Sequence, residues 1–138
     1  MAIAQSLCSS FKLQLLEAVH DFSTDTFKMA LYTSSATLGA STTVYTSSGE
    51  VVATGYTAGG EVMTGVVVTL TGTTAWVDFA DVVWSSPSLT ARGALIYNSS
   101  KSNKAVAVLD FGADKTTATT FTVQMPTPDA SNALIRIA

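Results

Sequence analysis

The sequence predicts a mainly β protein, an antiparallel, jelly-roll-like β-sandwich of about eight strands with one short N-terminal helix. Apolar residues alternate with Thr and Ser along most of the chain from about residue 26 to 138, which is the period of half-buried strands. Turn-forming residues recur about every ten residues, a spacing typical of sandwiches and barrels. Helical spacing of apolar residues occurs near the start. Because the chain has 138 residues and no interdomain linker is apparent, residues 1–138 are expected to form a single domain.

The helix is expected over about residues 9–22. Ser9 or Ser10 can cap its first turn by accepting a backbone N–H bond. Turn-forming residues begin at Asp21, where we expect the helix to end. The apolar residues that fall on one helical face are Phe11, Leu15, Ala18 or Val19, and Phe22.

From residue 26 the apolar period changes to two. Residues 27–32 place Phe27, Met29 and Leu31 on one face of a first strand. A short second strand is expected over residues 42–46, followed by a glycine-rich stretch suited to turns or to a bent edge. Residues 61–70 and 73–79 are then expected to form a hairpin around a turn at Gly72.

The second half contains the clearest hairpin signal. Two apolar arms, about residues 92–97 and 104–111, flank a polar loop of Asn, Ser and Lys. The second arm is apolar on both faces around Val108, as expected of a central strand covered on both sides. A short strand at 82–84, ended by Pro87, precedes this hairpin. Two further strands are expected, of which the first points Phe121, Val123 and Met125 inward and the second places Ala133, Ile135 and Ile137 on one face.

Charge is scarce in this sequence and not concentrated. Charged residues make up 12% of the chain, against about 25% in an average domain, and the net charge is -3. The basic residues are scattered, so no basic face predicts nucleic-acid binding. A surface of hydroxyls and small apolar groups favours association with other proteins, because interface cores are depleted of charge.

No targeting or cross-linking signal is visible. Residues 1–10 lack the basic and apolar regions of a secretory signal, and no apolar run approaches the ~20 residues of a membrane helix. Cys8 is the single cysteine, so no intrachain disulfide can form. We therefore expect a soluble protein that is made in the cytoplasm.

Neither catalytic, cofactor-binding nor metal-binding residues are predicted, and we do not expect an enzyme. His20 is the single histidine, and we expect it to interact with the helix dipole at the helix C-terminus. The close acidic pairs, Asp78 with Asp81 and Asp110 with Asp114, lack calcium-loop spacing and are expected at strand ends and turns. The glycine-rich residues 55–61 lack the Lys and following helix of a phosphate-binding loop.

The aromatic residues are candidates for a binding surface. Trp76 and Trp84 fall on neighbouring predicted strands, and a carbohydrate platform is conceivable there. Core packing and interface anchoring are commoner roles for such side chains. The tyrosines, Tyr32, Tyr45, Tyr56 and Tyr97, are spread along the sequence.

Several segments, in this order, are similar to segments of tailed-phage capsid cement (decoration) proteins. They are DTFKMALYTSSATL, GEVVATGYTAGG, ARGALIYNSSKSNKAVAVLDFGADK and FTVQMPTPDASNALIRIA, which together span about residues 25–138. The resemblance implies a jelly-roll-like sandwich on the outer surface of the capsid. It also implies that the protein pairs as a homodimer and clamps neighbouring major capsid subunits. It supplies no catalytic residues, cofactor or metal, and it implies no direct contact with nucleic acid or membrane.

A β-sandwich recognition module of the virion, binding glycan or a host surface, is the alternative. It would use Trp76, Trp84 or the tyrosines. Glycan binding with quenched tryptophan fluorescence would favour this alternative, and binding to emptied capsid shells would favour cement.

Overall fold

A computed structural model describes residues 2–85 and 88–138, so the predicted strand end at Pro87 lies outside the described residues. Its elements are β1 (Ser6–Leu7), α1 (Ser9–Leu16), β2 (Phe27–Tyr32), β3 (Glu61–Val62), β4 (Val67–Thr71), β5 (Thr74–Asp78), β6 (Val82–Ser85), β7 (Leu89–Asn98), β8 (Lys104–Thr117), β9 (Thr120–Val123) and β10 (Ile135–Ile137). The protein is a mainly β, antiparallel sandwich with a short N-terminal helix, which confirms the predicted fold class.

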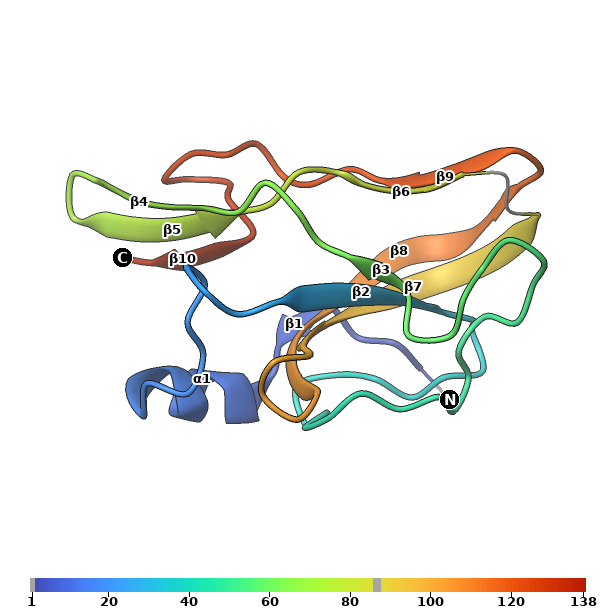
Figure 1. Ribbon diagram of the computed structural model, residues 1–138, viewed down its shortest axis with the longest axis horizontal. Helices are drawn as coiled ribbons and strands as arrows, with labels where there is room; N and C mark the ends of the chain where they lie inside the picture. Colours follow the sequence, from blue (N-terminus) through green and yellow to red (C-terminus); the bar gives the residue numbers. More distant parts are fainter. Residues whose placement is uncertain (1, 86–87) are drawn as a thin grey trace.

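The sandwich has one large sheet and two small ones. The large sheet has the strand order β1-β8-β7-β2-β3, which brings together strands distant in sequence. Figure 1 shows the two-stranded sheet β6-β9 and the three-stranded sheet β10-β5-β4 on one side of it. The helix α1 and the loops after β2 lie on its other side (Figure 1).

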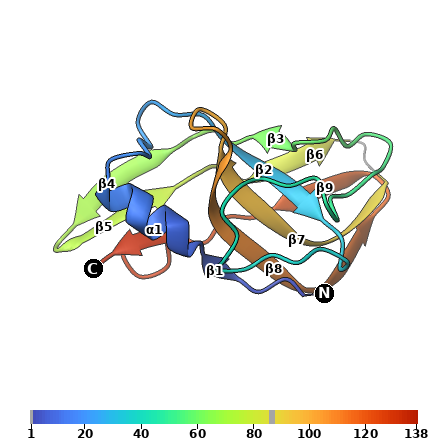
Figure 2. The same ribbon diagram turned by 90° about the horizontal axis from the view of Figure 1, so that it is seen from below.

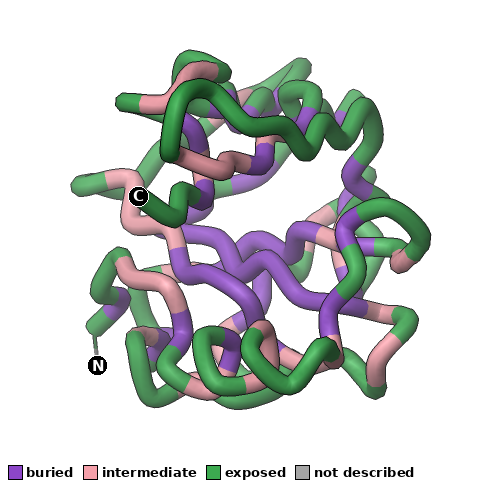
Figure 3. Tube along the Cα trace, turned by 90° about the vertical axis from the view of Figure 1, so that its left-hand side faces the viewer, coloured by how far each residue is buried: buried purple, intermediate pink, exposed green. Residues whose placement is uncertain are grey.

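The centre of the large sheet is buried on both faces, as the sequence predicts. In β8, Val108 lies between Ser6 of β1 and Leu95 of β7, and both apolar side chains are fully buried. Figure 3 shows this continuous buried layer between the outer segments. The predicted hairpin at 92–97 and 104–111 is confirmed and is longer, because β7 and β8 pair from Leu89 with Thr117 to Asn98 with Lys104.

The predicted helix boundary at residue 22 is wrong. The helix ends at Leu16 in a Schellman motif: the Val19 N–H donates to the Gln14 carbonyl and the Ala18 N–H donates to the Leu15 carbonyl. Ala18 takes the left-handed position (φ 60°) that glycine usually occupies, so the sequence carried no stop signal there.

The N-cap residue and the environment of Phe22 also differ from the prediction. The N-cap is Cys8, without a side-chain cap bond, rather than Ser9 or Ser10. After the helix, Phe22 stacks on Phe27 with ring centroids 4.6 Å apart, so it joins the aromatic core from a loop and not from a helix face.

Two strand predictions need correction. Residues 42–46 form no strand; Val44 makes an isolated bridge to Lys104. The predicted strand 61–70 is divided into β3 and β4, because Gly65 has φ 64° and interrupts it. Ile135 and Ile137 share one face of β10, as predicted, with Ile135 buried and Ile137 exposed. The turn at Gly72 and the inward positions of Phe121, Val123 and Met125 are confirmed.

Candidate functional site

His20 lies in a buried polar network and not at a helix terminus, so the helix-dipole interpretation is wrong. Its Nε2 is 2.9 Å from Gln14 Oε1 and its Nδ1 is 3.0 Å from Asn98 Nδ2. The same Asn98 amide donates to Asp25 at 2.8 Å, and Lys101 pairs with Asp25 at 2.8 Å. Because the Asn98 amide nitrogen can only donate, Nδ1 accepts, and the proton of the neutral ring is on Nε2, where it donates to Gln14.

The network holds each ionisable group in one charge state. Burial lowers the pKa of His20 below its ordinary value of 6.5, and Lys101 and Lys104 lower it further, against the opposing effect of Asp25. Burial by itself raises the pKa of the Asp25 carboxyl, but hydrogen bonds from Lys101, Asn98 and the Asp21 backbone outweigh it and lower the pKa to about 2. Both ring nitrogens of His20 are occupied, so the arrangement fixes the loop rather than presenting a base.

Asp78 ends β5 and Asp81 directly precedes β6, as predicted, but the strand-end prediction is wrong for Asp110 and Asp114. Both lie inside β8, because that strand continues past them to Thr117, which pairs with Leu89 of β7. Asp110 accepts bonds from Arg92 and from the Gly112 N–H, and the Arg92 guanidinium lowers the pKa of its carboxyl. Asp81 accepts the Met125 N–H at 2.7 Å. Burial raises the pKa of Asp78, and Asp81 adds to this effect. Among the described residues, no group of three or more His, Cys, Asp or Glu side chains is placed to hold a metal ion.

Cys8 is fully buried at the start of α1. Its Sγ lies 3.9 Å from the Gly39 carbonyl, and burial raises the pKa of the thiol to about 11. A protonated, inaccessible thiol has little nucleophilic character. Cys8 therefore has a packing role.

All four tyrosines meet around Glu50, a convergence that the sequence analysis missed. We call Glu50 with Tyr32, Tyr45, Tyr56 and Tyr97 the tyrosine cluster. Tyr45 and Tyr56 each donate to a different carboxylate oxygen of Glu50 at 2.6 Å. The Gly59 N–H also donates to Glu50, at 2.8 Å, and Tyr97 donates to the Gly59 carbonyl at 2.6 Å. The sequence does contain one sign of this cluster, because Glu50 is the single charged residue between positions 29 and 60.

The tyrosine cluster ties loops to the large sheet and is not arranged for catalysis. The Tyr56 hydroxyl also accepts the Leu31 N–H of β2 at 2.8 Å, and Tyr32 donates to the Thr46 carbonyl at 2.6 Å. Burial raises the pKa of all four tyrosines, and the Glu50 charge adds to the effect. The hydroxyls are therefore protonated donors at neutral pH, and both Glu50 oxygens are engaged.

Glycines in residues 55–61 form turns, as expected, and do not form a phosphate loop. Gly60 has φ 80°, and a Cβ there would lie 1.8 Å from the Met29 carbonyl oxygen. This close approach seats the loop directly against β2.

The two tryptophans have different environments. Trp84 is 1% exposed and packs with Tyr56 and Phe121, so it belongs to the core. Trp76 is half-buried on β5, and its indole N–H donates to Thr71 at 3.1 Å. The structure does not bring them together as one platform.

The three-stranded sheet forms a projecting arm with one uncharged face. We call β4, β5 and β10 the arm; Figures 1 and 2 show it at the same end of the molecule as α1. Strand alternation and pairing put six apolar residues on one of its faces: Val68, Leu70, Ala75, Val77, Ile135 and Ile137. Val77 and Ile135 are buried, whereas Val68, Leu70 and Ile137 are 53%, 66% and 56% exposed.

The outer edge of the arm is also unprotected. All five residues of β4 are exposed, and none is charged or proline. Edge strands usually carry such residues, because free backbone groups otherwise pair with other chains. The arm therefore combines an apolar face with an open strand edge, as an interaction surface does.

Comparisons of the chain with protein-family models, with curated proteins and with solved structures give no match. Among the described residues, no helix is both long enough and apolar enough to cross a bilayer.

Proposed function

We propose that this chain is a structural protein of a tailed-phage virion that binds the outside of the head and cements neighbouring major capsid subunits. The observation that carries the proposal is the uncharged, exposed apolar face of the arm. Together with an overall charged fraction of 12%, it indicates binding by shape and apolar contact. The resemblance of four ordered segments to cement proteins supports the choice of partner.

Such a protein stabilises a shell by binding its assembled state. A ligand that binds only the closed lattice lowers the free energy of that lattice relative to separated subunits. Pairing as a homodimer at two-fold positions would put the same surface on both sides of a seam. Engaging both copies raises the effective affinity by about 10²–10⁴ when the geometry allows both to bind.

The test mixes purified protein with expanded, DNA-free heads of the phage that encodes it and images the particles by electron cryomicroscopy. We expect extra density over the seams between capsid subunits. Leu70→Lys should reduce occupancy by about tenfold or more, because an arm contact would then bury an unpaired charge. Val52→Lys is the matched control, since Val52 is 97% exposed outside the arm. Bare seams at saturating protein would reject the proposal.

Glycan recognition is the alternative function, and a fluorescence titration with glycans tests it. The burial of Trp84 removes one of the two tryptophans from a sugar platform, and Trp76 on the arm is the remaining candidate. A glycan that quenches tryptophan fluorescence, with the quenching lost in Trp76→Phe, would favour this alternative over cement.

A further inference from the structure

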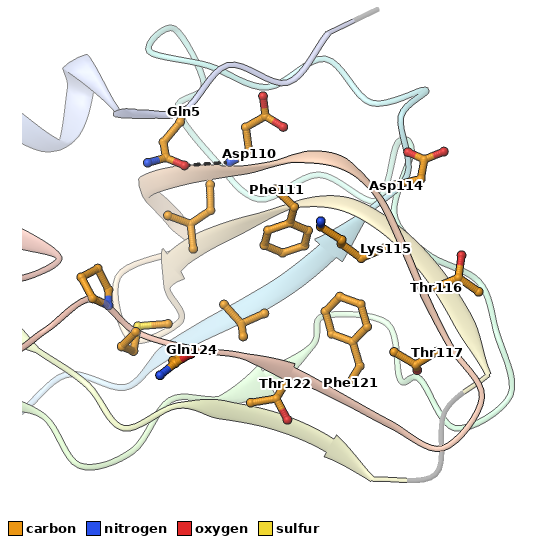
Figure 4. A pocket seen from close by; sticks show the side chains of 14 residues that line it. Gln5, Asp110, Phe111, Asp114, Lys115, Thr116, Thr117, Phe121, Thr122 and Gln124 are labelled. Carbon is orange, nitrogen blue, oxygen red and sulfur yellow. Dashed lines mark hydrogen bonds between the residues drawn. The ribbon is translucent and has the colours of Figure 1, made fainter.

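The sandwich is open along the flank between β8 and β9. A groove of about 710 Å³ lies there. Its apolar lining includes Leu109, Phe111, Phe121, Val123 and Met125. Figure 4 shows Phe111 and Phe121 pointing into this space from opposite strands, and their ring centroids are 6.0 Å apart. The strand β9, which borders the groove, lies at the opposite end of the molecule from the arm (Figure 1).

An irregularity in β8 produces the opening. Lys115 pairs with Ala91 and Asp110 pairs with Gly93, so residues 111–114 of β8 lie opposite Arg92 alone. Gly112, at φ 82°, allows the strand to bend away from regular pairing. The bend turns Phe111 towards β9 and leaves a gap that no strand fills among the described residues.

The groove is bordered by a free strand edge. In the two-stranded sheet, β9 pairs with β6 on one side. The Met125 N–H points to that side, because it donates to Asp81 just before β6. Backbone groups alternate along a strand, so those of Thr122 and Gln124 point to the open side. Among the described residues, no other strand pairs with this edge of the small sheet, which lies beside the apolar side chains of the groove.

The charges at the groove favour an acidic group on its occupant. Figure 4 shows Lys115 pointing into the space and Asp110 and Asp114 pointing away from it. Asp110 is already paired with Arg92. Within the described residues, Lys115 has neither an ion pair nor a side-chain hydrogen bond, so its ammonium is available to a carboxylate.

We propose that this groove is a β-augmentation site for an extended segment of a partner protein. The segment pairs its backbone with Thr122 and Gln124 as a third strand beside β9. Apolar side chains on alternate residues fill the floor between Phe111 and Phe121, and an acidic side chain meets Lys115. About six residues match the length from Thr120 to Met125, roughly 20 Å at 3.3 Å per residue. The inference goes beyond the proposed function, because it concerns a different surface and needs no capsid.

The test titrates isotope-labelled, full-length protein with a capped probe peptide of sequence Thr-Val-Thr-Val-Thr-Glu-Thr, which places both valines and the glutamate on one strand face, and follows the backbone amides by NMR. We expect shifts at Thr122, Gln124 and Phe111, and at least about tenfold slower hydrogen exchange of the Thr122 and Gln124 amides. The same peptide with proline in place of its central valine is the control, because it cannot complete the strand pairing. It should bind weakly or not at all.

Two protein variants, each with a matched control variant, assign the contacts. Phe111→Ala should weaken binding of the probe, whereas Leu16→Ala, an exposed apolar site on α1, should not. Lys115→Gln should weaken the glutamate peptide by about 1.5- to 5-fold and leave a glutamine peptide unchanged, as expected for an exposed ion pair. Lys12→Gln, exposed on α1, is the matched charge control.

Each remaining outcome rejects the proposal. No shift at β9 up to the solubility limit of the peptide, or equal binding of the proline peptide, would exclude strand pairing. Shifts that depend on protein concentration without peptide would assign the groove to a second copy of this chain. Shifts caused by an oligosaccharide in place of the peptide would assign it to a sugar. None of these results bears on head binding through the arm, so the two proposals fail separately.

Discussion

Removing one hydroxyl from the tyrosine cluster tests whether its buried hydrogen bonds stabilise the fold. Tyr56→Phe deletes the group that donates to Glu50 at 2.6 Å and accepts from the Leu31 N–H at 2.8 Å. The ring is retained, so the substitution leaves no large cavity. Tyr56 is buried, and water cannot easily replace either bond.

The magnitude follows from those two bonds. A hydrogen bond to a charged group contributes about 1.5–3 kcal/mol, and an unsatisfied buried N–H costs about 1–3 kcal/mol. Glu50 keeps its hydrogen bonds from Tyr45 and Gly59, so the expected loss of stability is smaller than the sum of these two energies. We expect the free energy of unfolding to fall by about 2–4 kcal/mol, which for a chain of this length lowers the Tm by roughly 10 °C.

The assay is urea unfolding at fixed protein concentration, followed by circular dichroism. Tyr45→Phe is the matched control: it also removes a donor to Glu50, but Tyr45 is half-buried and water can take its place. It should cost about 1 kcal/mol or less. Comparable m-values would show that the denatured state is unchanged. A Tyr56→Phe protein within about 0.5 kcal/mol of the parent, or a larger loss for Tyr45→Phe, would refute the reasoning.

Further predictions concern pH and backbone conformation. The four tyrosines of the cluster have pKa values raised above 10.0 in the folded protein. Their contribution to the free energy of unfolding is therefore present below pH 10 and is lost at higher pH. In a pH titration, tyrosinate absorbance should appear together with unfolding. The pKa of His20 is lowered in the folded protein, so its contribution to the free energy of unfolding is present above pH 6.5 and is lost as the pH falls through the folded pKa. The midpoint of its NMR titration should lie below 6.5, and the Tm should fall over the same pH range. Ala18→Gly should raise the free energy of unfolding by about 0.5–1 kcal/mol in urea titrations, because it relieves a left-handed alanine. Gly60→Ala should prevent or severely reduce folding because of the Met29 carbonyl, whereas Gly72→Ala, which meets nothing within 4 Å, should yield folded protein of lower Tm, as circular dichroism would show.

Strand positions were predictable where each side of a strand has one consistent environment. The alternation of Phe121, Val123 and Met125 was read correctly because β9 has one buried face. The both-faces-apolar pattern around Val108 was read correctly because a central strand is covered on two sides. The strand prediction for residues 42–46 was wrong, because residues of high β-propensity form a strand only where a neighbouring strand can pair with them. In this segment only Val44 pairs, in an isolated bridge to Lys104.

The sequence by itself determined the fold class, the scarcity of charge and the turns, because these depend on local pattern and composition. Tertiary structure decided which distant residues meet. The four tyrosines come from separate segments and converge on Glu50, and His20 meets Asn98 across 78 positions of sequence. The arm and the open flank beside β9 arise from strand order and from a bulge opposite Arg92. Such features depend on sheet pairing between remote segments, which a local period does not specify.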